Sequence, residues 1–184
     1  MMIQIWEYVS SLYRDIPLTV YEGILSVLCL GVVLIIALYG VMRGWRKIAG
    51  LVLAEYVFLI YCSTVIFRTY SEFRGHDFTP FWSYVAIYEG KVQYLPENIM
   101  NGLVFVPLGI LLGCTFMRLT WWKALLVGCC LSMTIEAIQY IFQRGFSEVD
   151  DVIHNTLGCV IGYGLFNAIK MFVKTNVANS FHKE

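Results

Sequence analysis

The chain has 184 residues, of which 59% are hydrophobic and 14% are charged. A soluble domain carries about 25% charged residues, so this composition indicates a membrane protein without a separate soluble domain. The formal net charge is zero and there is no basic tail. A nucleic-acid partner is therefore not expected.

The opening segment, residues 1–18, has apolar side chains at helical spacing and polar side chains on the opposite face. This pattern predicts an amphipathic helix lying in the membrane interface, where Trp6 and Tyr13 are favoured. A helix that packs on the rest of the protein would show the same pattern, so both interpretations stay open.

Five apolar runs follow, each long enough to cross a hydrocarbon core of about 30 Å. The sequence thus predicts an all-α membrane bundle, with a transmembrane domain over residues 19–175 and a tail over 176–184. The third run contains Pro107 among several glycines, which indicates a kink or a close helix contact. The polar and aromatic stretch before it, residues 68–98, is expected to be an interfacial loop. The five expected spans are 20–42, 48–67, 98–117, 123–142 and 151–173.

The positions of the basic residues predict the orientation of these spans. Eight of the 13 Lys and Arg residues fall on the side that holds Arg43, Arg46 and Lys47, and five fall on the other. Because basic residues favour the cytoplasmic side, the C-terminus is expected in the cytoplasm and the N-terminus outside.

This orientation places several polar residues near the outer ends of the spans. Their spacing of three or four residues puts the members of each helix on one face. At about 1.5 Å per residue, all lie within roughly 10 Å of the outer surface. We therefore predict a ligand-binding set of Arg68, Asn98, Asn101, Glu136, Gln139, Arg144, Asp151 and Asn155.

Glu136 is the first candidate for a functional group, because a carboxylate in the hydrocarbon layer costs several kcal/mol unless it faces water or a partner. Arg68 and Arg144 are its possible partners, and we expect all three in one cavity. An ion pair that only fixes helix packing, or a neutral Glu136, is the structural alternative. Glu55 lacks polar neighbours at helical spacing and is read as structural.

The start of the last span combines several polar residues. Asp150 and Asp151 suit a helix N-terminus, and with His154 their spacing is compatible with a divalent metal. Such residues are common at helix starts, so we predict neither a metal nor another cofactor. Asp151 and Asn155, one turn apart, are expected to line the cavity as a pair, since an unpaired buried amide costs about 1–3 kcal/mol.

An ordered set of residues runs through the chain from Arg68: Pro80-Phe81, Asn98 to Gly109 with Pro107, Glu136 and Gln139, Arg144 to Glu148, Asp151 to Gly158, and Gly162-Tyr163. With this set the chain resembles the VanZ-like family of bacterial membrane proteins. The loop after Arg144 is one residue longer than the expected family form, with Ser147 and Glu148 where one Asp is expected. The resemblance covers about residues 50–170 and implies a link to low-level resistance to the glycopeptide teicoplanin.

Two functions are consistent with these residues. In the first, the protein acts at the outer leaflet on a lipid-linked or lipidated envelope molecule, whose anionic head group is held by Arg68 and Arg144. In the second, it is an enzyme on a lipid-linked precursor with Glu136 or Asp151 as general acid or base. No known catalytic motif supports a specific reaction, and a structural, partner-binding subunit is a third possibility.

Overall fold

The computed structural model describes residues 46–66, 68, 70, 75–116 and 118–181, with side chains described as far as residue 176. The expected span over 20–42 and the expected amphipathic helix over 1–18 lie outside the described residues. The orientation of the chain in the membrane is not given by the fold and stays a prediction.

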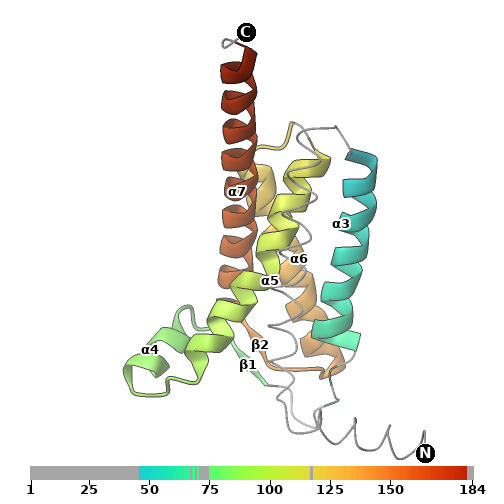
Figure 1. Cartoon of the computed structure of the whole chain (residues 1–184). Coiled ribbons are helices and arrows are strands. Elements are labelled where there is room, and N and C mark those ends of the chain that lie inside the picture. Colours follow the sequence, from blue (N-terminus) through green and yellow to red (C-terminus); the bar gives the residue numbers. More distant parts are fainter. Residues whose placement is uncertain (1–45, 67, 69, 71–74, 117, 182–184) are drawn as a thin grey trace, which may run out of the picture.

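Long helices dominate the described part of the chain (Figure 1). They are α3 (Arg46–Tyr61), which continues into a π-helical turn η1 (Cys62–Ile66), α5 (Tyr94–Thr115), α6 (Trp121–Phe142) and α7 (Val149–Phe181). Four stretches are long and apolar enough to cross a membrane, which confirms an all-α membrane bundle and four of the five expected spans. These stretches are Arg46–Ile66, Tyr94–Thr115, Trp121–Phe142 and Val149–Asn176.

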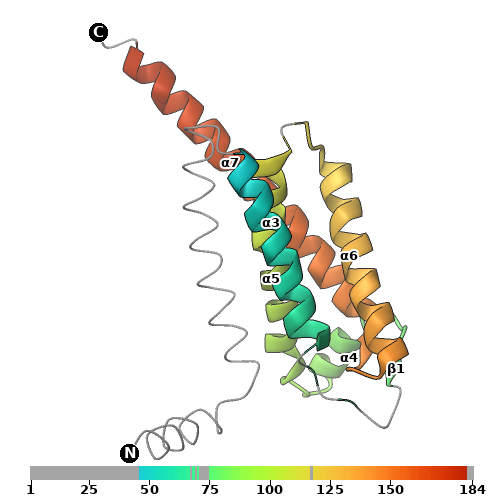
Figure 2. The ribbon, with the colours of Figure 1, turned by 90° about the vertical axis from the view of Figure 1, so that its right-hand side faces the viewer.

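Helix α5 is the central helix of the described bundle. Its residues from Phe105 to Cys114 are all buried, as expected of a helix that is apolar on every side. It packs most closely against α7, while α3 packs on α5 and α6 packs on α7. The C-terminal part of α7 extends beyond the ends of the other helices in both views (Figures 1 and 2).

The contact between α5 and α7 depends on glycines that let the two backbones touch. A Cβ atom on Gly158 would overlap the carbonyl oxygen of Gly102, and one on Gly162 would overlap that of Val106. From the other helix, a Cβ on Gly109 would overlap the carbonyl of Cys159. Small residues allow this close approach in membranes, so the expected helix contact near Pro107 is confirmed.

The segment expected as a loop over 68–98 contains regular structure. Strand β1 (His76–Asp77) pairs in parallel with β2 (Ser147–Glu148), and a short helix α4 (Trp82–Tyr88) follows. Helix α5 also begins at Tyr94, before the expected start at Asn98. The expected interfacial loop is therefore wrong in that the segment contains a helix and a strand, because α4 and β1 are held by residues about 70 positions away that local patterns do not reveal.

Candidate functional site

A cavity of about 80 Å³ lies between α3, α5, α6 and α7. One water needs about 10–15 Å³ by this measure, so the cavity has room for a group several times larger. It is lined by Tyr56, Leu59, Ile60, Ser63, Thr64, Arg68, Met100, Asn101, Val104, Phe105, Ile135, Glu136, Gln139, Asp151 and Asn155.

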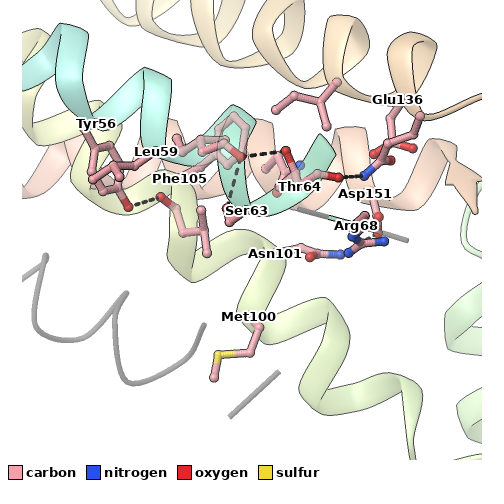
Figure 3. A pocket seen from close by; sticks show the side chains of 15 residues that line it. Tyr56, Leu59, Ser63, Thr64, Arg68, Met100, Asn101, Phe105, Glu136 and Asp151 are labelled. Carbon is pink, nitrogen blue, oxygen red and sulfur yellow. Dashed lines mark hydrogen bonds between the residues drawn. The ribbon is translucent and has the colours of Figure 1, made fainter. Parts of the chain in front are cut away.

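The cavity has a polar end and an apolar end. In Figure 3 the side chains of Arg68, Asn101, Glu136 and Asp151 gather at one end, while Leu59 lies toward the other. A cavity of this kind suits an amphiphilic molecule better than a fully polar one.

The polar end lies near one end of the bundle. Asp151 is in the first turn of α7, and Arg68 follows η1. Asn101 is seven residues from the start of α5, and Glu136 is six residues from the end of α6, or about 10 Å or less along each helix. The polar groups therefore lie near the same end of the helices that surround the cavity.

Two hydrogen bonds connect α7 to its neighbours at the polar end. Asn101 Nδ2 donates to Asp151 Oδ1 over 2.6 Å, and Asn155 Nδ2 donates to Ser132 Oγ over 2.8 Å. Asp151 and Asn155 thus both line the cavity, as their spacing predicts. They do not pair with each other, because each bonds to a side chain from another helix.

The two polar residues of α6 are almost fully buried. The backbone N–H of Glu148 donates to Glu136 Oε2 over 2.9 Å, and Gln139 Nε2 donates to the carbonyl oxygen of Thr64 over 2.8 Å. Glu136 is 7% exposed and Gln139 is 3% exposed. The Oε1 atom of Gln139 is buried and accepts no hydrogen bond from the described residues.

Arg68 supplies the positive charge of the cavity. It lies close enough to Glu136 and Asp151 to interact with both electrostatically. No hydrogen bond joins its guanidinium to another residue of the described ranges. Gly145, at a φ of +152°, makes room for it, because a Cβ there would lie 2.9 Å from Arg68 Nη1.

Two residues of the predicted set do not line the cavity. Arg144 Nη1 donates to the carbonyl oxygens of Ile66, over 3.0 Å, and Arg68, over 2.9 Å. The expectation that Arg144 shares the cavity with Arg68 and Glu136 is therefore wrong, since its guanidinium instead holds the backbone that follows η1. Asn98 is buried beneath α4, where its Nδ2 donates to a hydroxyl.

Asp150 anchors α4, a role that sequence reasoning missed. It is 1% exposed and accepts hydrogen bonds from Phe81 N at 2.5 Å, Ser83 N at 3.0 Å and Ser83 Oγ at 2.5 Å. Asn98 donates to the same Ser83 hydroxyl over 3.0 Å. An Asp at the start of a helix is typical of an N-terminal cap of that same helix. Asp150 instead accepts hydrogen bonds from the backbone at the start of α4, which is far away in the sequence.

The alternative of a metal at Asp150, Asp151 and His154 finds no geometric support. His154 Nε2 is 2.9 Å from the Tyr84 hydroxyl, while the two carboxylates bond to different elements. Among the residues that the structure describes, no group of three His, Cys, Asp or Glu could hold a metal ion.

The hydroxyl residues of α3 and η1 were also missed. Tyr56 donates from its hydroxyl to the carbonyl of Val104 over 2.7 Å, and Ser63 and Thr64 donate to Ile60. All three line the cavity. The sequence held one signal for these residues, since their hydroxyl groups stand in an otherwise apolar run.

Glu148 adds a further acid beside the cavity. Burial, and after it the neighbouring carboxylate of Asp151, raises the pKa of Glu148 from 4.5 to about 7. Glu148 therefore keeps its proton to a higher pH than a solvent-exposed glutamate does.

The helices and the cavity define a polytopic α-helical membrane protein with an amphipathic site near one end of its bundle. The family model described as VanZ/LLP1 matches residues 26–171, so the chain belongs to this family and the resemblance in its motifs is confirmed. Protein VanZ of Enterococcus faecium is 39% identical over 74 residues, which are 39% of this chain and 46% of the relative. The match thus spans about half the length of that relative. No solved structure matches the chain.

Proposed function

We propose that the protein binds, at the outer leaflet, the polar head group of a lipid-linked or lipidated envelope molecule. The observation that supports this most directly is the amphipathic cavity. Its polar end lies about 10 Å or less from the ends of α5 and α6, by the number of residues along each helix. A head group at the interface would reach Arg68 and Asp151, while the apolar end would contact the start of a lipid chain.

The guanidinium of Arg68 is the group best placed to bind a ligand. An arginine can donate two parallel hydrogen bonds to a phosphate or carboxylate, which gives both strength and orientation. Resistance to teicoplanin, implied by the family resemblance, is proposed to follow from binding of the drug or of the envelope molecule on which it acts.

The binding test compares Arg68→Gln with Arg118→Gln, which removes the same charge from an exposed residue outside the cavity. Each variant is purified, its bound lipids are identified by mass spectrometry, and teicoplanin susceptibility is measured in cells that produce it. We expect Arg68→Gln to lose bound lipid and protection at normal accumulation, while Arg118→Gln keeps both. Retention of both by Arg68→Gln would overturn the proposal.

The outer-leaflet location is tested by labelling. Tyr88, the last residue of α4, is 93% exposed. Helix α4 lies at the end of the bundle where α7 begins, which is the end that holds the polar part of the cavity (Figure 1). In a protein with its native cysteines replaced, we expect Tyr88→Cys to react with a membrane-impermeant thiol reagent added outside intact cells. Reaction only after permeabilisation would place this end, and the cavity, on the cytoplasmic side.

A second candidate function is catalysis, favoured by the two carboxylates at one end of the cavity. Glu136 and Asp151 could act as a general acid and a general base on a lipid-linked substrate. In that case Glu136→Gln should retain bound lipid but stop the conversion of an added membrane lipid extract, followed by mass spectrometry. If the wild-type protein converts no component of the extract, binding is the better description.

A further inference from the structure

The charges around the cavity do not suit a simple anion. Among the described residues that line it, the charged ones are Arg68, Glu136 and Asp151. They are two acidic side chains and one basic side chain, so the acidic groups outnumber the basic one. A purely anionic head group would bind the guanidinium, but it offers no hydrogen-bond donor to the carboxyl oxygens.

The hydrogen bonds of the acidic and amide side chains leave several of their acceptors open. Glu136 uses Oε2 for a backbone N–H, and Asp151 uses Oδ1 for an amide. Within the part of the chain that the structure describes, Glu136 Oε1, Asp151 Oδ2 and Gln139 Oε1 accept nothing further. Gln139 Oε1 is fully buried with no partner among the described residues, so its missing hydrogen bond is costly.

We infer, on the basis of the proposed head-group binding, that the cavity selects a head group carrying a primary ammonium beside a phosphate. A primary ammonium offers three N–H donors and no acceptor, which suits the open acceptors of Glu136, Asp151 and Gln139. The phosphate would take the hydrogen bonds that Arg68 can donate. A trimethylated ammonium has no N–H donor and leaves the acceptors unpaired.

The size of the cavity agrees with this class of head group. Its volume of about 80 Å³ is several times the space of one water, enough for a small phosphoammonium group but not for a sugar chain. Such a group occurs in phospholipids and in lipid-linked envelope molecules, and the cavity recognises the chemistry that they share.

The test uses three probes with the same two oleoyl chains: phosphatidylethanolamine, phosphatidylcholine and phosphatidylglycerol. Each is titrated into the full-length protein in detergent, and bound lipid is measured by native mass spectrometry. We expect the ethanolamine lipid to bind about tenfold more tightly than either other lipid. Free phosphoethanolamine should displace it if the head group alone is recognised, and failure to displace it would assign recognition to the whole lipid.

Charge-removing variants then assign each part of the head group. Glu136→Gln and Asp151→Asn should each bring the affinities for the ethanolamine and glycerol lipids closer together, while Arg68→Gln should weaken both. Glu55→Gln is the matched control, because Glu55 is exposed on α3 and does not line the cavity. Its affinities should equal those of the wild type.

Two results separate the inference from the function on which it rests. If the glycerol or choline lipid binds as tightly as the ethanolamine lipid, or both carboxylate variants keep the full preference, the ammonium inference is wrong while head-group binding stands. If none of the three lipids binds more tightly to the wild type than to Arg68→Gln, both are wrong.

Discussion

Replacement of Asp150 by alanine should detach α4 from the start of α7. The substitution removes three hydrogen bonds to a buried carboxylate, from Phe81 N, Ser83 N and Ser83 Oγ. Bonds to charged groups contribute about 1.5–3 kcal/mol each, so even the low end predicts a loss of about 4 kcal/mol. Because α4 is short and lies at the edge of the bundle, we expect this loss to appear as local opening (Figure 1).

Hydrogen exchange of peptides covering residues 79–90, followed by mass spectrometry, measures that opening directly. A loss of about 4 kcal/mol corresponds to exchange about 10³-fold faster, and Asp150→Asn, which keeps one acceptor, should fall between alanine and the wild type. Asp77→Ala is the control, since Asp77 accepts one exposed bond from Thr79 N at 2.8 Å. Exchange in α4 that is the same in Asp150→Ala and the wild type would refute the anchoring role.

Three further changes test other parts of the structure. Gly158→Ala should lower the thermal midpoint of unfolding in detergent well below that of Gly164→Ala. A Cβ at Gly158 would overlap the backbone of Gly102, whereas a Cβ at Gly164 would meet only the side chain of Trp121. Equal midpoints would show that α5 and α7 can move apart enough to accept the added Cβ. Gly145→Ala should displace Arg68 and reduce lipid binding several-fold in a titration, at normal accumulation; unchanged affinity would contradict this. For Glu148, whose pKa rises from 4.5 to about 7 on folding, the folded state holds the proton more tightly, so stability is lost as pH rises through this interval. The variant Glu148→Gln should remove that part of the pH dependence of the midpoint between pH 4.5 and 8, and two parallel curves would rule out a contribution from Glu148.

The sequence was informative where hydrophobicity and helical spacing decide the structure. The apolar runs predicted four described spans, because each covers the membrane thickness without help from other segments. The spacing of Asp151 and Asn155 placed both on one face of α7, and both line the cavity. This prediction needed no information about other segments, because the face on which a residue lies depends only on the periodicity of its own helix.

The partners of the polar residues could not be predicted in the same way. Arg144 looked like a cavity residue, but it donates to backbone carbonyls that become available only where η1 ends. Asp150 looked like a local cap, and its partners come from a helix about 70 residues earlier. Hydrogen bonds of this kind depend on which loops meet in space, and no periodic pattern records that.

The backbone contact between α5 and α7 also determines which parts of the protein can move. With Gly158 and Gly162 against carbonyl oxygens of α5, these two helices cannot slide or rotate past each other without separating, so they form one rigid body. Asn101 and Asp151 belong to that body and stay fixed relative to each other. Entry of a molecule larger than the cavity must therefore be accommodated by hinge-like movement of α3 or α6. A movement of α3 would carry Arg68 with it. Binding of a ligand would therefore also change the position of the guanidinium that contacts the ligand.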